Sequence, residues 1–184
     1  YFSSKPMSSP LVIALAYDRL CTFEFACAVE LFSLDRPELN VEWYRFQVCA
    51  IEAGKLRAAG GILVEAPYSL RRLDQLKQGD IIVVPGWRDT DEIPPQELLK
   101  KIRAAYARGV RFCTICSGIF VLAAAGILDD RKVTTHWRYA EKLQLAYPSL
   151  LVESDDLYVD DGQIISSAGS AAGLDMLLYL VRKD

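Results

Sequence analysis

The chain has 184 residues, of which 52% are hydrophobic and 24% are charged, so it can bury a substantial core and we expect one domain over residues 1–184. A formal net charge of −3 and a pI near 5.3 argue against DNA binding by this segment itself and against a polybasic membrane patch. No apolar run approaches the ~20 residues of a membrane-spanning helix, and residues 1–10 lack the hydrophobic stretch of a secretion signal. We therefore expect a cytoplasmic protein in which residues 1–10 are a disordered or extraneous tail.

From residue 11 onward, apolar runs of strand length alternate with helical patterns. In chain order the sequence predicts a strand at 11–17, a helix at 23–34, strands at 41–52 and 79–86, a helix at 94–109, a strand at 110–116, a helix at 117–126, a strand at 132–137 and a helix at 170–184. Two further segments, 54–66 and 156–169, have the character of β-hairpins, the second with Asp161 and Gly162 as its turn. Apolar strands that alternate with helices predict an α/β three-layer sandwich with a mostly parallel sheet.

The final segment places Ala171, Leu174, Leu177, Leu178 and Val181 at helical spacing, so we expect it to form a helix. The chain stops on this helix and does not begin with methionine. We expect it to be a piece of a longer protein, although a trimmed complete protein would look the same.

The five cysteines indicate reduced thiols rather than a disulfide framework. Cys113 and Cys116 form a C-x-x-C motif, but residues three apart on a strand point to opposite faces, so a redox pair is not expected. With one histidine and no second C-x-x-C, we expect no metal site, and the sequence indicates no cofactor.

Cys116 stands where a predicted strand turns into a helix, followed by the small residues Ser117 and Gly118. Ligands of parallel sheets collect at the carboxyl ends of the strands, and a sharp turn there requires small neighbours. A thiol at a helix N-terminus also faces unpaired amides, which lower its pKa. The residue is either a nucleophile or sensor or, as buried cysteines usually are, a small core residue.

Two other side chains are candidates for the same edge. His136 follows a second predicted strand end, which would place its ring at the same edge of the sheet as Cys116. Glu24 lies between two phenylalanines at the start of the first predicted helix, where it either faces water or points into a pocket with a raised pKa. A thiol, an imidazole and a carboxyl group are the set that a thiol site requires.

These motifs resemble the PfpI-type branch of the class I glutamine amidotransferase-like superfamily. "CTICSG" is similar to the family's nucleophile elbow, "KVTTHW" to its histidine strand, "FEFACAVELF" to its glutamate helix and "IIVVPGW" to its glycine-bearing strand. The resemblance covers nearly the whole chain and implies a flavodoxin-like fold. It also implies roles: Cys116 as the elbow thiol, Glu24 as its hydrogen-bonding partner and His136 as the neighbouring base. The amides of Trp87 and Ser117 would be oxyanion donors, which Gly86 makes accessible.

More narrowly, residues 16–32 and 116–182 are similar to the N-terminal domain of AraC-type transcription regulators. The resemblance implies a ligand-sensing and dimerising domain whose helix-turn-helix DNA-binding domain lies beyond residue 184. Its partners would be a small-molecule effector, a second copy of the chain, and DNA only through that missing domain, with no membrane. Because Trp87 replaces a family glycine and Ser117 replaces a histidine of protease-like members, we expect sensing rather than turnover.

The alternatives are a stand-alone cysteine-dependent hydratase, amidase or aldehyde-modifying enzyme, and a redox sensor that responds through oxidation of Cys116.

Overall fold

The computed structural model describes residues 9–184, so the first eight residues of the expected tail lie outside it. Ser9 and Pro10 belong to the fold, because Ser9 is buried and the carbonyls of both residues accept hydrogen bonds from Arg45. The helices are α1 Thr22–Ser33, α2 Gln96–Ala107, α3 Ile119–Ala125, α4 Trp137–Ala146 and α5 Ala171–Lys183. Short 3₁₀ helices span Pro37–Leu39, Ala59–Gly61, Leu70–Gln75 and Cys116–Gly118.

Among the described residues, seven strands form one sheet in the order β10-β11-β7-β6-β1-β2-β5. These strands are β1 Leu11–Ala16, β2 Arg45–Ala50, β5 Tyr68–Ser69, β6 Ile81–Val84, β7 Arg111–Ile115, β10 Tyr158–Asp161 and β11 Ile164–Ser167. All neighbours pair in parallel except β10 with β11, which are antiparallel. This is the predicted mostly parallel sheet.

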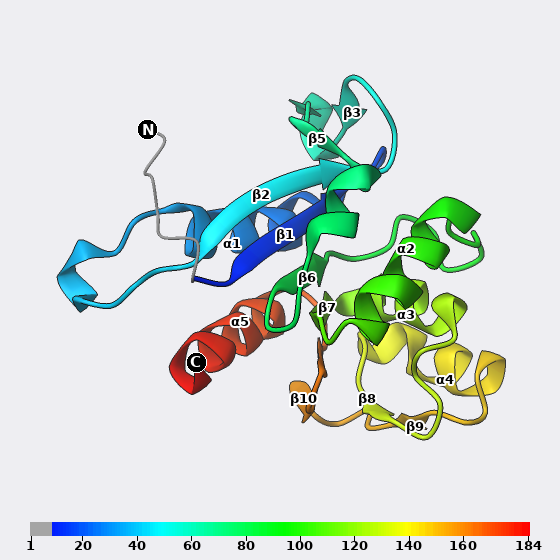
Figure 1. Cartoon of the computed structure of the whole chain (residues 1–184). Helices are drawn as coiled ribbons and strands as arrows, with labels where there is room; N and C mark the ends of the chain where they lie inside the picture. The colour runs from blue at the N-terminus through cyan, green and yellow to red at the C-terminus, as the bar shows by residue number, and fades with distance from the viewer. Residues whose placement is uncertain (1–8) are drawn as a thin grey trace.

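Helices cover both faces of the sheet, with α1 and α5 on one side and α2, α3 and α4 on the other (Figure 1). Every residue of β1 and β6 is buried, because a central parallel strand has helices on both faces. The predicted three-layer α/β sandwich is therefore confirmed.

Both predicted hairpins form. The first pairs β3 Leu56–Arg57 with β4 Leu63–Val64, and the second pairs β10 with β11. The turn residues of the second are Gly162 and Gln163, one position later than predicted, because Asp161 still pairs with Ile164.

One predicted element needs correction, and one helix was not predicted. The predicted strand at 132–137 shrinks to β8 Lys132–Val133, which pairs with β9 Leu151–Val152 in a small separate sheet. Helix α4 was not among the predicted elements. The predicted C-terminal helix forms as α5, and its buried residues are Ala172, Gly173, Met176, Leu177 and Leu180.

Candidate functional site: the residues around Cys116

Cys116 forms the turn between β7 and α3 and has a positive φ of 54°. This left-handed conformation costs a non-glycine residue about 1–2 kcal/mol, and such strained residues cluster at functional sites. The turn packs tightly against the end of β6. A Cβ on Gly118 would lie 2.4 Å from the carbonyl oxygen of Val84 and 2.6 Å from that of Pro85, so only glycine permits this approach. The predicted elbow is present, and its small residues have the predicted steric reason.

The segment after β6 meets the elbow, because β6 and β7 are parallel neighbours that end at the same edge. The hydroxyl of Ser117 is buried and donates a hydrogen bond of 2.9 Å to the carbonyl oxygen of Trp87. A Cβ on Gly86 would lie 3.4 Å from the Ser117 hydroxyl, which shows how closely the two segments approach. Gly86, Trp87, Cys116 and Ser117 therefore meet at the carboxyl edge of the sheet.

Glu24 lies in the first turn of α1 and is partly buried, which raises the pKa of its carboxyl group. It is also close enough to act on the thiol: burial raises the pKa of Cys116, and the charge of Glu24 raises it further. A hydrogen bond from the backbone of Ser117 acts in the opposite direction. The expected lowering of the Cys116 pKa is therefore wrong, because burial outweighs the amide donors of the turn.

His136 reaches this region by a different route from the predicted one. It does not end a strand of the main sheet but caps helix α4, where its Nδ1 accepts a 3.1 Å hydrogen bond from the amide of Arg138. The neighbouring Thr135 connects it to the elbow, since its hydroxyl donates a 2.7 Å hydrogen bond to the carbonyl oxygen of Cys116. The imidazole also packs on Gly169, where a Cβ would lie 2.4 Å from its Cδ2. Its role as a base stays a prediction.

Two residues that were not predicted as part of the site lie against Gly86. Tyr17, the residue after β1, is fully buried and donates a hydrogen bond from its hydroxyl to the carbonyl oxygen of Gly86. Cys21 precedes α1, and a Cβ on Gly86 would lie 3.0 Å from its sulfur. The signal for Cys21 was available, because it stands, like Cys116, just before a helix that follows a strand.

Burial raises the pKa of the Glu24 carboxyl group and of the thiol and phenol groups that lie around Cys116. Burial, then the charges of Glu24 and Cys116, raise the pKa of Cys21 to about 12. Burial is also the largest cause of the raised pKa of Tyr17, followed by Cys21 and Glu24. The two thiols and the phenol are therefore neutral at neutral pH, and the charge of Glu24 acts on both thiols.

Trp87 is 3% exposed, and its ring is fixed from several sides. It stacks edge-on against Tyr17 at a centroid distance of 5.0 Å, and its Nε1 donates a 2.8 Å hydrogen bond to the carbonyl oxygen of Glu92. The guanidinium of Arg88 lies 4.8 Å above the indole and pairs with Glu52 and Glu92. These contacts hold the indole of Trp87 in one orientation.

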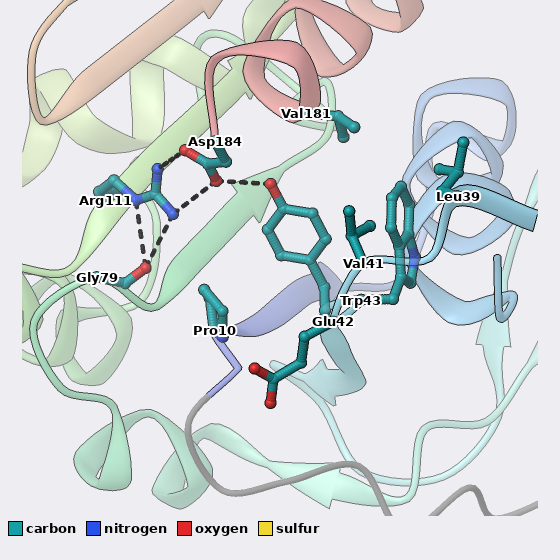
Figure 2. Close-up of a pocket in the computed structure, with 10 residues that line it drawn as sticks. Pro10, Leu39, Val41, Glu42, Trp43, Gly79, Arg111, Val181 and Asp184 are labelled. Atoms are coloured by element: carbon teal, nitrogen blue, oxygen red, sulfur yellow. Dashed lines mark hydrogen bonds and ion pairs between the residues drawn. The ribbon is translucent and has the colours of Figure 1, made fainter. Parts of the chain in front are cut away.

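A separate pocket of about 560 Å³ lies at the opposite end of the parallel strands from Cys116, beside their amino ends (Figure 2). Its lining comes from residues at or just before the first residues of strands, including Pro10, Trp43 and Arg111, and from the end of α5. Arg111 and Tyr44 both bind the carboxylate of Asp184 there, at 2.7 Å and 2.6 Å. Trp43 and Tyr44, which precede β2, are buried, and both residues also line this pocket.

Within residues 9–184 no cluster of three His, Cys, Asp or Glu side chains is arranged to hold a metal ion. None of the helices in that range has the length and hydrophobicity needed to span a bilayer.

The sequence is similar to a known protein family and to several characterised proteins. Residues 12–183 match the sequence model of the DJ-1/PfpI family. Over 158 residues, or 85% of this chain, the sequence is 34% identical to the HTH-type transcriptional regulator CdhR of Pseudomonas aeruginosa, of which the match covers 45%. It is also 34% identical over 106 residues to an isonitrile hydratase of Pseudomonas putida, with 56% of this chain and 45% of that protein covered.

A solved structure agrees with the fold. The crystal structure of an AraC family transcriptional regulator from Pseudomonas putida superimposes with a TM-score of 0.77 at 21% identity, over 95% of this chain and 91% of the other. The chain spans about half the length of the curated regulators it matches.

Proposed function

Because this chain belongs to the DJ-1/PfpI family, and because curated relatives are helix-turn-helix regulators, we propose that it is the ligand-sensing and dimerising part of an AraC-type transcription regulator. The observation that carries the proposal is the extent of the match to CdhR, which takes in 85% of this chain but only 45% of that regulator. DNA contact belongs to a separate helix-turn-helix domain in this proposal, in keeping with the acidic balance of the chain. The working compartment is the cytoplasm.

The effector site of the proposal is formed by the residues around Cys116. Cys116, Glu24 and the Trp87 and Ser117 amides would surround a small polar or carbonyl-bearing nitrogenous metabolite, with His136 at the rim. The ligand must bind one arrangement of the dimer more tightly than the other, because a ligand of equal affinity for both arrangements shifts nothing. The neutral thiols and the strained elbow support this choice over the pocket at the opposite ends of the strands, where Arg111 and Asp184 already pair with each other.

Reading the gene downstream of the Asp184 codon tests the regulatory assignment directly. We expect an open frame that encodes a helix-turn-helix domain, and a stop codon at that position would overturn the proposal. A thermal-shift screen of amino acids, amines and amides then tests the site. We expect one class to stabilise the protein and to lose this effect in Cys116→Ser or Glu24→Gln, while Trp43→Phe in the opposite pocket retains it.

The similarity to isonitrile hydratase favours a second function, in which the Cys116 thiol adds to an electrophilic carbon and water completes the hydration. Incubation with cyclohexyl isocyanide separates the two functions, since hydration of this compound yields the N-substituted formamide. Formamide production that disappears in Cys116→Ser would establish the enzyme. If wild type and Cys116→Ser produce the formamide at the same background rate, the hydratase function is excluded and the sensing function remains.

A further inference from the structure

A buried side chain, Tyr17, fixes the orientation of the peptide group between Gly86 and Trp87. The carbonyl oxygen of Gly86 accepts the hydroxyl of Tyr17, a fully buried residue, and therefore points toward the core. The described residues contain no cis peptide bond, and in a trans peptide the C=O and N–H groups point in opposite directions. The N–H of Trp87 is consequently directed away from the core.

The other side of Trp87 is held as well. Its own carbonyl oxygen accepts the 2.9 Å hydrogen bond from Ser117, and its indole is fixed by Tyr17 and Glu92. Among residues 9–184 no hydrogen bond uses the Trp87 N–H, although both carbonyls that flank it are occupied. The result is an oriented backbone donor beside the elbow, with no protein acceptor of its own.

We propose that Tyr17 is a positioning residue, which aims the Trp87 N–H at the carbonyl or carboxylate oxygen of a ligand whose electrophilic carbon lies against the Cys116 sulfur. The proposal rests on the proposed function only in taking the residues around Cys116 as the ligand site. Tyr17 cannot itself meet the ligand, because it is fully buried and its hydroxyl is bound to Gly86. Its effect passes through the peptide that it holds.

Two thiol reagents of different mechanism provide the test. With acrylamide, the sulfur of Cys116 bonds to the terminal alkene carbon, and the alkene electron pair moves through the carbonyl to give an enolate oxygen, after which the adjacent carbon takes a proton. With iodoacetamide, the sulfur bonds to the methylene carbon as iodide leaves, and no oxyanion develops. Only the first reaction gains from a donor aimed at the carbonyl oxygen.

The experiment compares the Cys116 alkylation rates of wild type and Tyr17→Phe by peptide-resolved mass spectrometry. Removal of an oxyanion donor typically lowers a rate by 10²–10³. Because Tyr17→Phe only loosens the donor, we expect the acrylamide rate to fall roughly tenfold, with the iodoacetamide rate within about twofold of wild type. Tyr44→Phe is the matched control, since it removes a tyrosine hydroxyl hydrogen bond at the opposite ends of the strands and should leave the ratio of the two rates unchanged.

An equal fall in both rates would show a general structural role and overturn the proposal, as would an unchanged acrylamide rate. Cys116→Ser supplies the background for each reagent. Neither reagent is an effector, so failure to find a metabolite or a DNA-binding domain would leave this ratio intact, and an unchanged ratio would leave the regulatory assignment untouched.

Discussion

Replacing Gly118 with alanine isolates the contact on which the elbow depends. The new Cβ would lie 2.4 Å from the carbonyl oxygen of Val84, whereas ordinary contact begins at 3.4 Å, so the elbow or the end of β6 must move by about 1 Å. The obstructing atoms are backbone and cannot rotate away. The upper end of the usual range for overpacking applies, about 3 kcal/mol.

Urea unfolding followed by tryptophan fluorescence measures this loss. A domain of this size has about 5–15 kcal/mol of stability, so Gly118→Ala should still fold, with a Tm lower by roughly 6–12 °C. The iodoacetamide rate of Cys116 should change as well, because the elbow that carries the thiol has moved.

Gly162→Ala is the matched control. Gly162 has a φ of 76° and open space around its Cβ position, so alanine there adds backbone strain of about 1 kcal/mol without a clash. Its Cys116 reactivity should equal that of wild type. Equal losses of stability in the two variants, or an unaltered Cys116 reactivity in Gly118→Ala, would refute this prediction. Either result would show that the close approach of Gly118 to the end of β6 does not fix the position of the elbow.

Three further predictions concern single side chains. His136→Ala should lower the free energy of unfolding by about 1 kcal/mol through loss of the α4 cap, whereas His136→Asn keeps a capping group and should retain it in a urea titration; equal losses would contradict the capping role. The pH midpoint of Cys116 alkylation should lie above that of an ordinary thiol and fall in Glu24→Gln, because burial and the nearby carboxylate both raise the pKa; a midpoint below the ordinary value would refute this. Burial opposes ionisation of Asp184, but hydrogen bonds from Arg111 and Tyr44 hold its pKa below the ordinary value, so its stabilisation is present above the ordinary value of about 4 and is lost as the pH falls from there through the lowered pKa. Asp184→Asn should therefore cost about 1 kcal/mol at pH 7 and clearly less at pH 3 in urea titrations at both pH values, and a constant difference would exclude the ion pair as the cause.

The residues around Cys116 show which parts of a site a sequence pattern can predict. Cys116, Ser117 and Gly118 could be placed because strand, turn and small residues are consecutive, so their geometry is local. Tyr17 could not be assigned, since a tyrosine at the end of an apolar strand has the same pattern whether it fills the core or holds a peptide from the next strand. Its partner, Gly86, lies 69 positions away.

The histidine and the thiol pKa show the limits more sharply. The sequence placed His136 near the elbow, but by pairing its strand with the main sheet, whereas the actual connection is the hydrogen bond from Thr135 to Cys116. The helix N-terminus correctly indicated amide donors near the thiol. It could not show that burial and Glu24 together outweigh them, because both depend on how α1 packs against the elbow.

The sequence by itself determined the alternation of strands and helices, the parallel character of the sheet and the turn that carries Cys116, because hydrophobic periodicity and small residues act within a few positions of each other. The tertiary structure decided which face of α5 is buried, where β8 pairs and which groups surround the thiol. Those outcomes depend on competition for contacts between segments far apart in the chain, and no local pattern records the result of that competition.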